Sequence, residues 1–226
     1  MKFWTNKQVK KLKKIFVVII IVSILTSCYN FIPKEGDLIF QDLDCGSLCE
    51  AIEKVEKGYQ NTNISHMGVI VKYDNKFYVA EAYGQVKKTP LKEFLYRTTD
   101  NNGTPKVIVG RIKKQYFKQY ANNFKKILDT LYGKPYDEEF EINNGKYYCC
   151  ELVYEIFKNK KGENLFKLKQ MSFTNMETTK IDSVWIEYFH KLKKNIPIGK
   201  PGCNPANYSK SNKIKIKFPY YKPFKK

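Results

Sequence analysis

The chain has 226 residues, of which 42% are hydrophobic and 28% are charged, and its formal net charge is +19. This length allows one ordinary domain with a proper core, and no internal repeat or low-complexity block is evident. The lysines are spread among asparagine and tyrosine without a recognisable nucleic-acid module, so we attribute the charge to compositional drift and expect no nucleic-acid partner.

The N-terminus has the pattern of a lipoprotein signal. Residues 1–14 carry six lysines and no acid, residues 15–25 are apolar apart from Ser23, and Leu-Thr-Ser-Cys closes the run at Cys28. The apolar run is shorter than the roughly 20 residues that span a bilayer, and small residues before a cysteine suit cleavage. Resemblance to bacterial lipoproteins implies a signal peptide at 1–27, a lipidated Cys28 and a tether over 28–35. The alternative is an uncleaved anchor helix.

The next part of the chain, residues 36–211, is predicted to form one α+β domain. Its mixture of an antiparallel sheet with segregated helices is typical of that class. Residues 212–226 are predicted to be a basic aromatic tail, either lying on an anionic surface or solvated and disordered. The apolar patterns predict strands at 36–41, 67–72, 77–82 and 106–112, and helices at 46–58, 91–97, 115–132, 149–159 and 181–194.

A histidine and a carboxylate occur on the two predicted strands at 67–72 and 77–82. His66 lies at the entry of the first strand, and Glu81 is the one acid in the otherwise apolar second strand. A buried carboxylate needs a partner, and paired strands would bring Glu81 to the imidazole. The alternative for Glu81 is a solvated position at the strand edge.

Two adjacent thiols, Cys149 and Cys150, mark the start of the predicted helix at 149–159. Free N–H groups and the positive end of the helix dipole favour thiolate over thiol at such a position. The alternative is that one or both cysteines are simply small buried hydrophobic residues, as most cysteines are. With a histidine and a carboxylate in reach, the set predicts a thiol nucleophile, a base and an orienting acid.

These residues occur in motifs that resemble the NlpC-type papain-like cysteine hydrolases, specifically the circularly permuted YiiX/YebB-like (YaeF-like) branch. In the non-permuted family the nucleophile helix precedes the Gly-Asp-Leu and Ser-His-x-Gly strands, whereas here it follows them. The resemblance implies a circularly permuted papain-like fold with Cys149 as nucleophile, His66 as base and Glu81 as the third polar residue. The matching segments are residues 36–40 (GDLIF), 65–70 (SHMGVI), 77–82 (FYVAEA), 131–137 (LYGKPYD), 148–153 (YCCELV) and 201–205 (PGCNP).

One departure concerns Cys150, which stands where the branch usually has serine. Chemistry alone leaves both thiols open as nucleophile. The alignment favours Cys149, since adjacent helical residues point about 100° apart and only one can face His66. The resemblance also implies that Tyr136, Cys45 and Gly46 line the site. We expect Tyr148, Cys150 and Asn204 there as well, with Asn204 also the alternative partner for the histidine.

The remaining cysteines have no assigned chemistry. The four-residue spacing of Cys45 and Cys49 raises both a disulfide and a metal pair, while Cys203 lies far away in the sequence and His190 has no companion histidine. Packed thiols are the default expectation, with no metal and no cofactor.

The predicted activity is acyl transfer through a thioester, with the oxyanion held by backbone N–H groups at the start of the 149–159 helix. The family implies a cysteine amidase or peptidase, and an envelope location suggests a peptidoglycan stem-peptide amide as substrate. A lipid amidase or acyltransferase is the first alternative. A lipid-anchored binding module without activity is the second, although all three catalytic positions are filled.

Overall fold

The computed structural model describes residues 32–219, and the chain from Pro33 onward forms one compact unit. The predicted signal peptide, Cys28 and most of the tether lie outside the described residues, as does the end of the predicted tail. Within the described part, no helix is long and apolar enough to cross a membrane.

A six-stranded antiparallel sheet forms the centre of the domain, with the strand order β4-β3-β2-β1-β5-β8. The apolar strands β1, β2 and β5 lie inside it, and β1 pairs with both of the others, as Leu38 does with Val69 and Gly110. This architecture confirms the α+β prediction. The strands are β1 (Leu38–Gln41), β2 (His66–Tyr73), β3 (Lys76–Tyr83), β4 (Gln85–Pro90), β5 (Val107–Ile112) and β8 (Ile214–Pro219).

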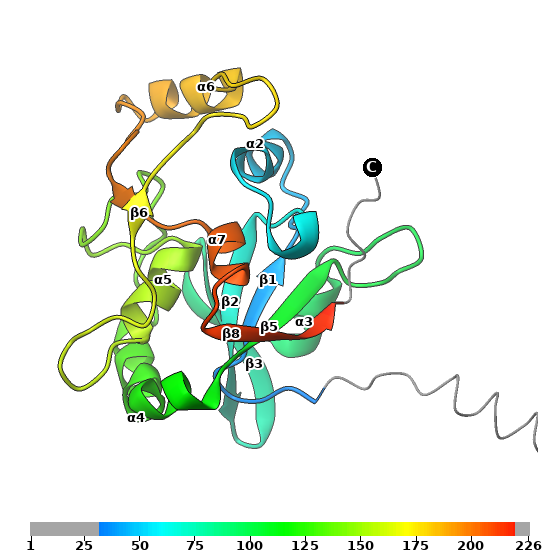
Figure 1. Cartoon of the computed structure of the whole chain (residues 1–226), viewed down its shortest axis with the longest axis vertical. Helices are drawn as coiled ribbons and strands as arrows, with labels where there is room; N and C mark the ends of the chain where they lie inside the picture. Colours follow the sequence, from blue (N-terminus) through cyan, green and yellow to red (C-terminus); the bar gives the residue numbers. More distant parts are fainter. Residues whose placement is uncertain (1–31, 220–226) are drawn as a thin grey trace, which may run out of the picture. The chain divides into compact units, whose positions relative to one another are not determined.

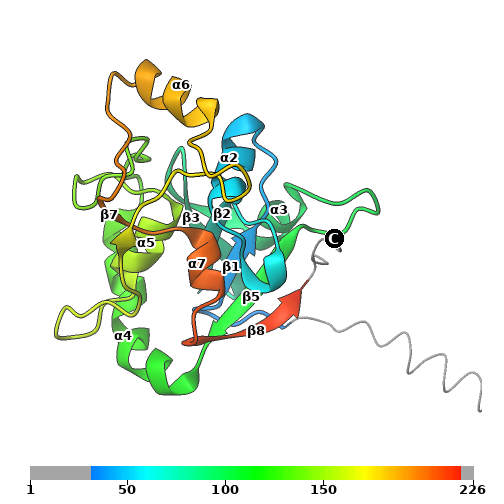
Figure 2. The same cartoon turned by 45° about the horizontal axis from the view of Figure 1, so that its top comes forward.

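Helices surround this sheet. Helix α5 lies against β2 and β3 with α4 beside it, whereas α2 neighbours α6 (Figures 1 and 2). The helices are α2 (Ser47–Val55), α3 (Leu91–Tyr96), α4 (Lys114–Leu131), α5 (Cys149–Ile156), α6 (Ser183–Lys191) and α7 (Pro205–Ser209), with a 3-10 turn η1 (Tyr59–Asn61). A second, two-stranded sheet joins β6 (Lys169–Gln170) to β7 (Pro201–Gly202).

The apolar stripes of α5 and α4 fix the position of α5 on the sheet. Leu152, Val153 and Ile156 are fully buried on α5, as helical spacing predicts. From α4, Phe124 stacks on Phe157 just past the end of α5, with 5.3 Å between ring centroids. Burial of six of the eight residues of α5 therefore holds its first residue against the sheet, close to the start of β2.

Gly68 allows β2 and β3 to approach each other closely. A Cβ at this position would lie 2.7 Å from the Ala80 carbonyl oxygen and 2.5 Å from a Val79 methyl carbon. Real Cβ atoms do not come so near to backbone, so any larger residue would push the strands apart. The glycine of the Ser-His-x-Gly motif thus brings Glu81 within reach of the histidine two positions earlier.

The structure contains elements that the sequence patterns did not predict, namely β4, β6, β7, α7 and β8. Strand β4 is an edge strand of mostly polar residues, in which Val86 and Thr89 alone are buried. Strand β8 occupies part of the predicted tail, because Ile214 turns inward while Lys215 and Lys217 stay exposed. That alternation of isoleucine and lysine is a period-two signal that identifies a strand.

Candidate active site

His66 links the nucleophile to a buried acid. It is the first residue of β2, and Cys149 is the first residue of α5. The Nε2 atom of His66 lies 2.6 Å from Oε2 of Glu81, and the ring also hydrogen-bonds Cys149. Since Glu81 engages Nε2, Nδ1 is the nitrogen that remains for the thiol. The three residues predicted from the sequence, Cys149, His66 and Glu81, thus have side chains in contact.

Glu81 is fully buried and keeps its charge through four contacts. Besides His66, Thr89 Oγ1 donates to Oε1 at 2.5 Å, and the Arg97 guanidinium donates to both carboxylate oxygens at 2.9 and 2.5 Å. Burial by itself would raise the pKa of Glu81, but the hydrogen bonds from Arg97 and His66 hold it well below the usual range. The residue is therefore a carboxylate at neutral pH.

The environment of His66 favours the imidazolium. Its ring stacks on Phe94 and meets Tyr83 edge-on, both at 5.9 Å between centroids. Burial opposes protonation, yet the hydrogen bonds with Cys149 and Glu81 outweigh it and raise the pKa of His66 to about 9. The histidine thus carries a proton that it can donate to a leaving group.

The two adjacent thiols have opposite tendencies. A hydrogen bond from Cys150 holds the pKa of Cys149 well below its ordinary value; burial opposes this, while His66 and the Met67 backbone N–H assist it. Burial raises the pKa of Cys150 well above its ordinary value. Cys149 is therefore the thiolate of an ion pair with His66, and Cys150 remains a protonated thiol beside it.

Arg97 and Thr89 belong to this site, although sequence reasoning missed them. The only signal was composition: the chain has just two arginines. Both bind a buried carboxylate through two guanidinium nitrogens, Arg97 with Glu81 and Arg111 with Asp37 at 2.6 Å. Arginine suits this role because its planar fork matches a carboxylate.

A hollow of about 160 Å³ opens beside Cys149. The predicted site-lining residues Tyr136, Tyr148, Cys150 and Asn204 lie on its wall, whereas Cys45 and Gly46 do not. Much of the wall is apolar. Its apolar residues besides the tyrosines and cysteines include Ile52, Val55, Phe140, Met171, Phe173 and Trp185.

Two of the wall residues have structural contacts of their own. The Asn204 side chain accepts a hydrogen bond from the Ala206 N–H at 2.8 Å and so caps α7, while Glu81 occupies the histidine. The structure therefore does not use Asn204 to orient the base. The Tyr148 hydroxyl accepts from the Cys203 N–H at 3.0 Å, which joins the start of α5 to β7.

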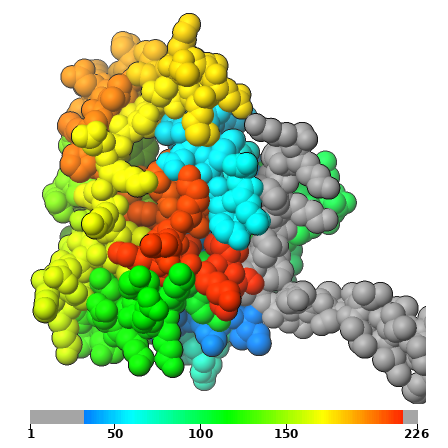
Figure 3. Space-filling view, in the orientation of Figure 1, coloured from blue at the N-terminus to red at the C-terminus, as the bar shows by residue number. Residues whose placement is uncertain are grey.

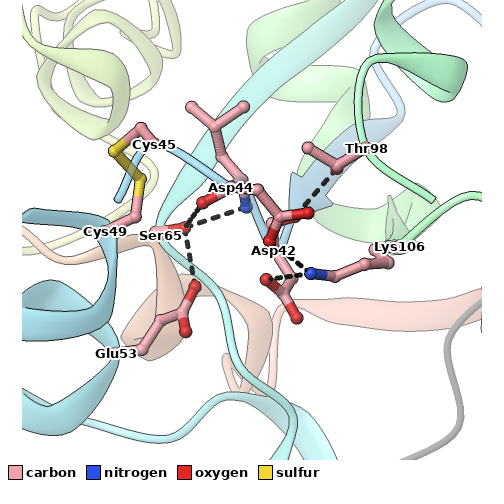
Figure 4. Close-up of a disulfide and its surroundings, with 9 residues drawn as sticks. Asp42, Asp44, Cys45, Cys49, Glu53, Ser65, Thr98 and Lys106 are labelled. Atoms are coloured by element: carbon pink, nitrogen blue, oxygen red, sulfur yellow. Dashed lines mark hydrogen bonds and ion pairs between the residues drawn. A yellow bond between two sulfur atoms is a disulfide. The ribbon is translucent and has the colours of Figure 1, made fainter. Parts of the chain in front are cut away.

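Cys45 and Cys49 form a disulfide, which corrects the expectation of packed thiols (Figure 4). Their four-residue separation at the start of α2 brings the Cα atoms to 5.3 Å, within disulfide range. The bridged turn connects to the base through Ser65, which accepts from the Leu43 N–H and donates to Glu53 at 2.8 Å. Cys149, Cys150 and Cys203 are free.

We predict that Arg97→Gln lowers the free energy of unfolding by about 3–5 kcal/mol at pH 7, because it leaves a buried carboxylate without its main partner. The depressed pKa of Glu81 contributes stability that is present above its unfolded value and is lost as the pH falls. In the variant the pKa of Glu81 rises, so the difference in free energy of unfolding between the wild type and Arg97→Gln should be smaller at pH 4 than at pH 7. Urea denaturation at both values measures this.

The control for this variant is Lys92→Gln, an exposed change on the same helix, α3. It should alter stability by less than about 0.5 kcal/mol at either pH. A loss in Arg97→Gln that is as small as the control's, or that stays constant with pH, would show that Arg97 does not keep Glu81 charged.

Comparison with known proteins gives a consistent assignment. The family described as "Permuted papain-like amidase enzyme, YaeF/YiiX, C92 family" matches residues 32–215. The uncharacterized protein YiiX of Escherichia coli (strain K12) is 28% identical over 189 residues, which is 83% of this chain and 88% of that protein.

A solved structure, described as metalloprotein yiiX from Escherichia coli O157:H7, has the same fold with a TM-score of 0.69. It is 24% identical in sequence, and the match covers 84% of this chain and 98% of that one. Since the family match spans most of the chain and includes every residue of the His66 cluster, the protein belongs to the YaeF/YiiX (C92) family of permuted papain-like amidases and is a cysteine hydrolase.

Proposed function

We propose that the protein cleaves an amide, or an ester, through a thioester on Cys149. The observation that carries this is His66 held between the Cys149 thiol and the buried Glu81 carboxylate. The thiolate adds to the substrate carbonyl carbon and the carbonyl electron pair moves to oxygen. As the tetrahedral species collapses, the bond to nitrogen breaks and His66 gives its proton to the departing amine.

The second half of the reaction releases the acyl group. The neutral imidazole takes a proton from water, the hydroxide adds to the thioester carbonyl, and the thiolate leaves. Glu81 keeps the ring in position and stabilises its charge, as a carboxylate does in related triads.

The start of α5 supplies donors for the oxyanion. The first backbone hydrogen bond of α5 joins the Leu152 N–H to the Tyr148 carbonyl oxygen at 3.0 Å. The preceding N–H groups of the first turn have no such intrahelical partner, and they lie next to the nucleophile. They are therefore available when negative charge develops on the substrate oxygen.

Two substrate classes fit this chemistry. An envelope location favours an amide of a peptidoglycan stem peptide. The apolar wall formed by Phe140, Met171, Phe173 and Trp185 favours the other class, a lipid acyl group cleaved or transferred by the same thiolate.

No step of this mechanism uses a metal. The E. coli O157:H7 relative is described as a metalloprotein. In residues 32–219 of this chain, no group of three or more His, Cys, Asp or Glu side chains is arranged to hold a metal ion, so these residues do not fit such a centre.

The location that we propose is the cell envelope, with the protein anchored by a lipid on Cys28. Its support is the sequence of the first 28 residues, in which a lysine-rich start and an apolar run end at Leu-Thr-Ser-Cys.

We expect Cys149→Ser to abolish reaction of this site with iodoacetamide-alkyne at pH 6.5 and to remove the burst of p-nitrophenol from p-nitrophenyl octanoate, because both require the thiolate. Cys150→Ser should keep most of both, since serine still donates a hydrogen bond to Cys149. Peptide mass spectrometry locates the label. Equal loss in both variants, with the fold intact by circular dichroism, would show that Cys149 is not the sole nucleophile.

For the anchor, mass spectrometry of the protein from the membrane fraction should show a mature N-terminus at Cys28 that carries lipid. Cys28→Ser should leave the protein unprocessed or release it from that fraction, because the acceptor thiol is gone. A mature N-terminus elsewhere without lipid would refute the lipoprotein proposal.

A further inference from the structure

A second, larger hollow shares part of its wall with the hollow beside Cys149. At about 160 Å³ the first is smaller than typical ligand pockets of roughly 300–1,000 Å³, whereas the second has about 410 Å³. Both are lined by the same segment that includes β7 and α7. Their shared residues are Glu56, Lys169, Gly202, Cys203, Asn204 and Asn207.

The second hollow differs from the first in charge. Its wall carries four lysines, from the segment leading into β6 and the segment after α7, against one acid, Glu56; four positive charges and one negative give +3. Lys210 pairs with Glu56 at 2.6 Å, so these two charges cancel. Lys169 donates to Asn207 at 2.5 Å and Lys213 donates to the Leu165 carbonyl, and because both acceptors are neutral these lysines keep their charge. Figure 3 shows the yellow surface of residues 165–170 beside the orange-red surface of α7 on this face. The lysines are Lys167, Lys169, Lys210 and Lys213.

One tyrosine of this wall, Tyr208, is buried with its hydroxyl beside Cys203. Tyr208 is 4% exposed, and its ring is fixed by stacking on Phe166 at 4.3 Å between centroids. The hydroxyl oxygen has almost no exposed surface and lies near the Cys203 and Cys150 thiols, so Tyr208 contributes its ring and not this oxygen to the wall of the hollow.

We propose that the lysine-lined hollow binds a phosphate group of the substrate whose acyl portion occupies the apolar hollow at Cys149. Lysine side chains are suited to phosphate because each ammonium group is a point charge that donates hydrogen bonds to the phosphate oxygens. A molecule that fills both hollows is an amphiphile with an apolar acyl chain and a phosphate. This assignment rests on the proposed thioester chemistry and selects the lipid class over a stem peptide.

The test measures binding without turnover. Isothermal titration at fixed ionic strength compares n-octyl phosphate, neutral n-octyl glucoside and inorganic phosphate on the Cys149→Ala protein, which cannot form a thioester. We expect n-octyl phosphate to bind most tightly, with inorganic phosphate competing at lower affinity because it fills only one of the two hollows.

A double variant locates the phosphate. Lys167→Gln with Lys169→Gln changes two exposed residues of the hollow and should weaken n-octyl phosphate binding about tenfold or more. The matched control, Lys76→Gln with Lys92→Gln, removes the same charge from exposed positions outside the hollow.

Equal affinity for n-octyl glucoside and n-octyl phosphate would overturn the proposal, as would equal weakening by the control pair. Equal affinity for inorganic phosphate and n-octyl phosphate would assign the hollow to free phosphate and overturn its role in substrate binding. Because Cys149→Ala is used throughout, lysine-dependent binding would persist even if the thioester mechanism were wrong, so the two failures are distinguishable.

Discussion

The buried ion pair between Glu81 and Arg97 is the interaction on which the rest of the site depends. A carboxylate with no exposed surface loses its hydration, and it remains charged only if protein groups replace that hydration. Here the replacement comes from three elements around β3: Thr89 on β4, Arg97 at the end of α3 and His66 on β2. Hydrogen bonds with Cys149 and Glu81 raise the pKa of His66 against the effect of burial, and hydrogen bonds from Cys150 and His66 lower the pKa of Cys149. The Glu81 carboxylate thus supports the charge of His66 without itself lining the hollow beside Cys149.

The chain order of the permuted family requires that this site be assembled from distant segments. His66 and Glu81 are neighbours because β2 and β3 form a hairpin with a close approach at Gly68, whereas Cys149 arrives only after β5 and α4. Its place is fixed by the apolar face of α5 on the sheet, with Phe124 and Phe157 stacked behind it. Fold stability and site geometry therefore share the same contacts.

The sequence allowed prediction of Cys149, His66 and Glu81 because each is an exception in its setting: thiols at a helix start, a histidine at a strand entry and an acid in an apolar strand. Arg97 and Thr89 were not predicted, since their role depends on a polar edge strand and a short helix that return to Glu81 across space. For Cys45 and Cys49 the sequence left a disulfide and a metal pair open beside the default of packed thiols. Only the backbone at the start of α2 decides for the disulfide. Strand β8 was hidden among lysines, although its alternating isoleucines carried the signal.

The protonation state of His66 tests the account most directly. The chain has only two histidines, so ¹⁵N NMR of the imidazole rings gives two sets of signals, and His190→Gln identifies the set that belongs to His66. The account predicts an imidazolium at pH 7 that loses its proton near pH 9, with a lower midpoint in Cys149→Ala because the thiolate partner is gone. A neutral ring at pH 7, with a midpoint near the ordinary value of about 6.5 that Cys149→Ala leaves unchanged, would contradict it.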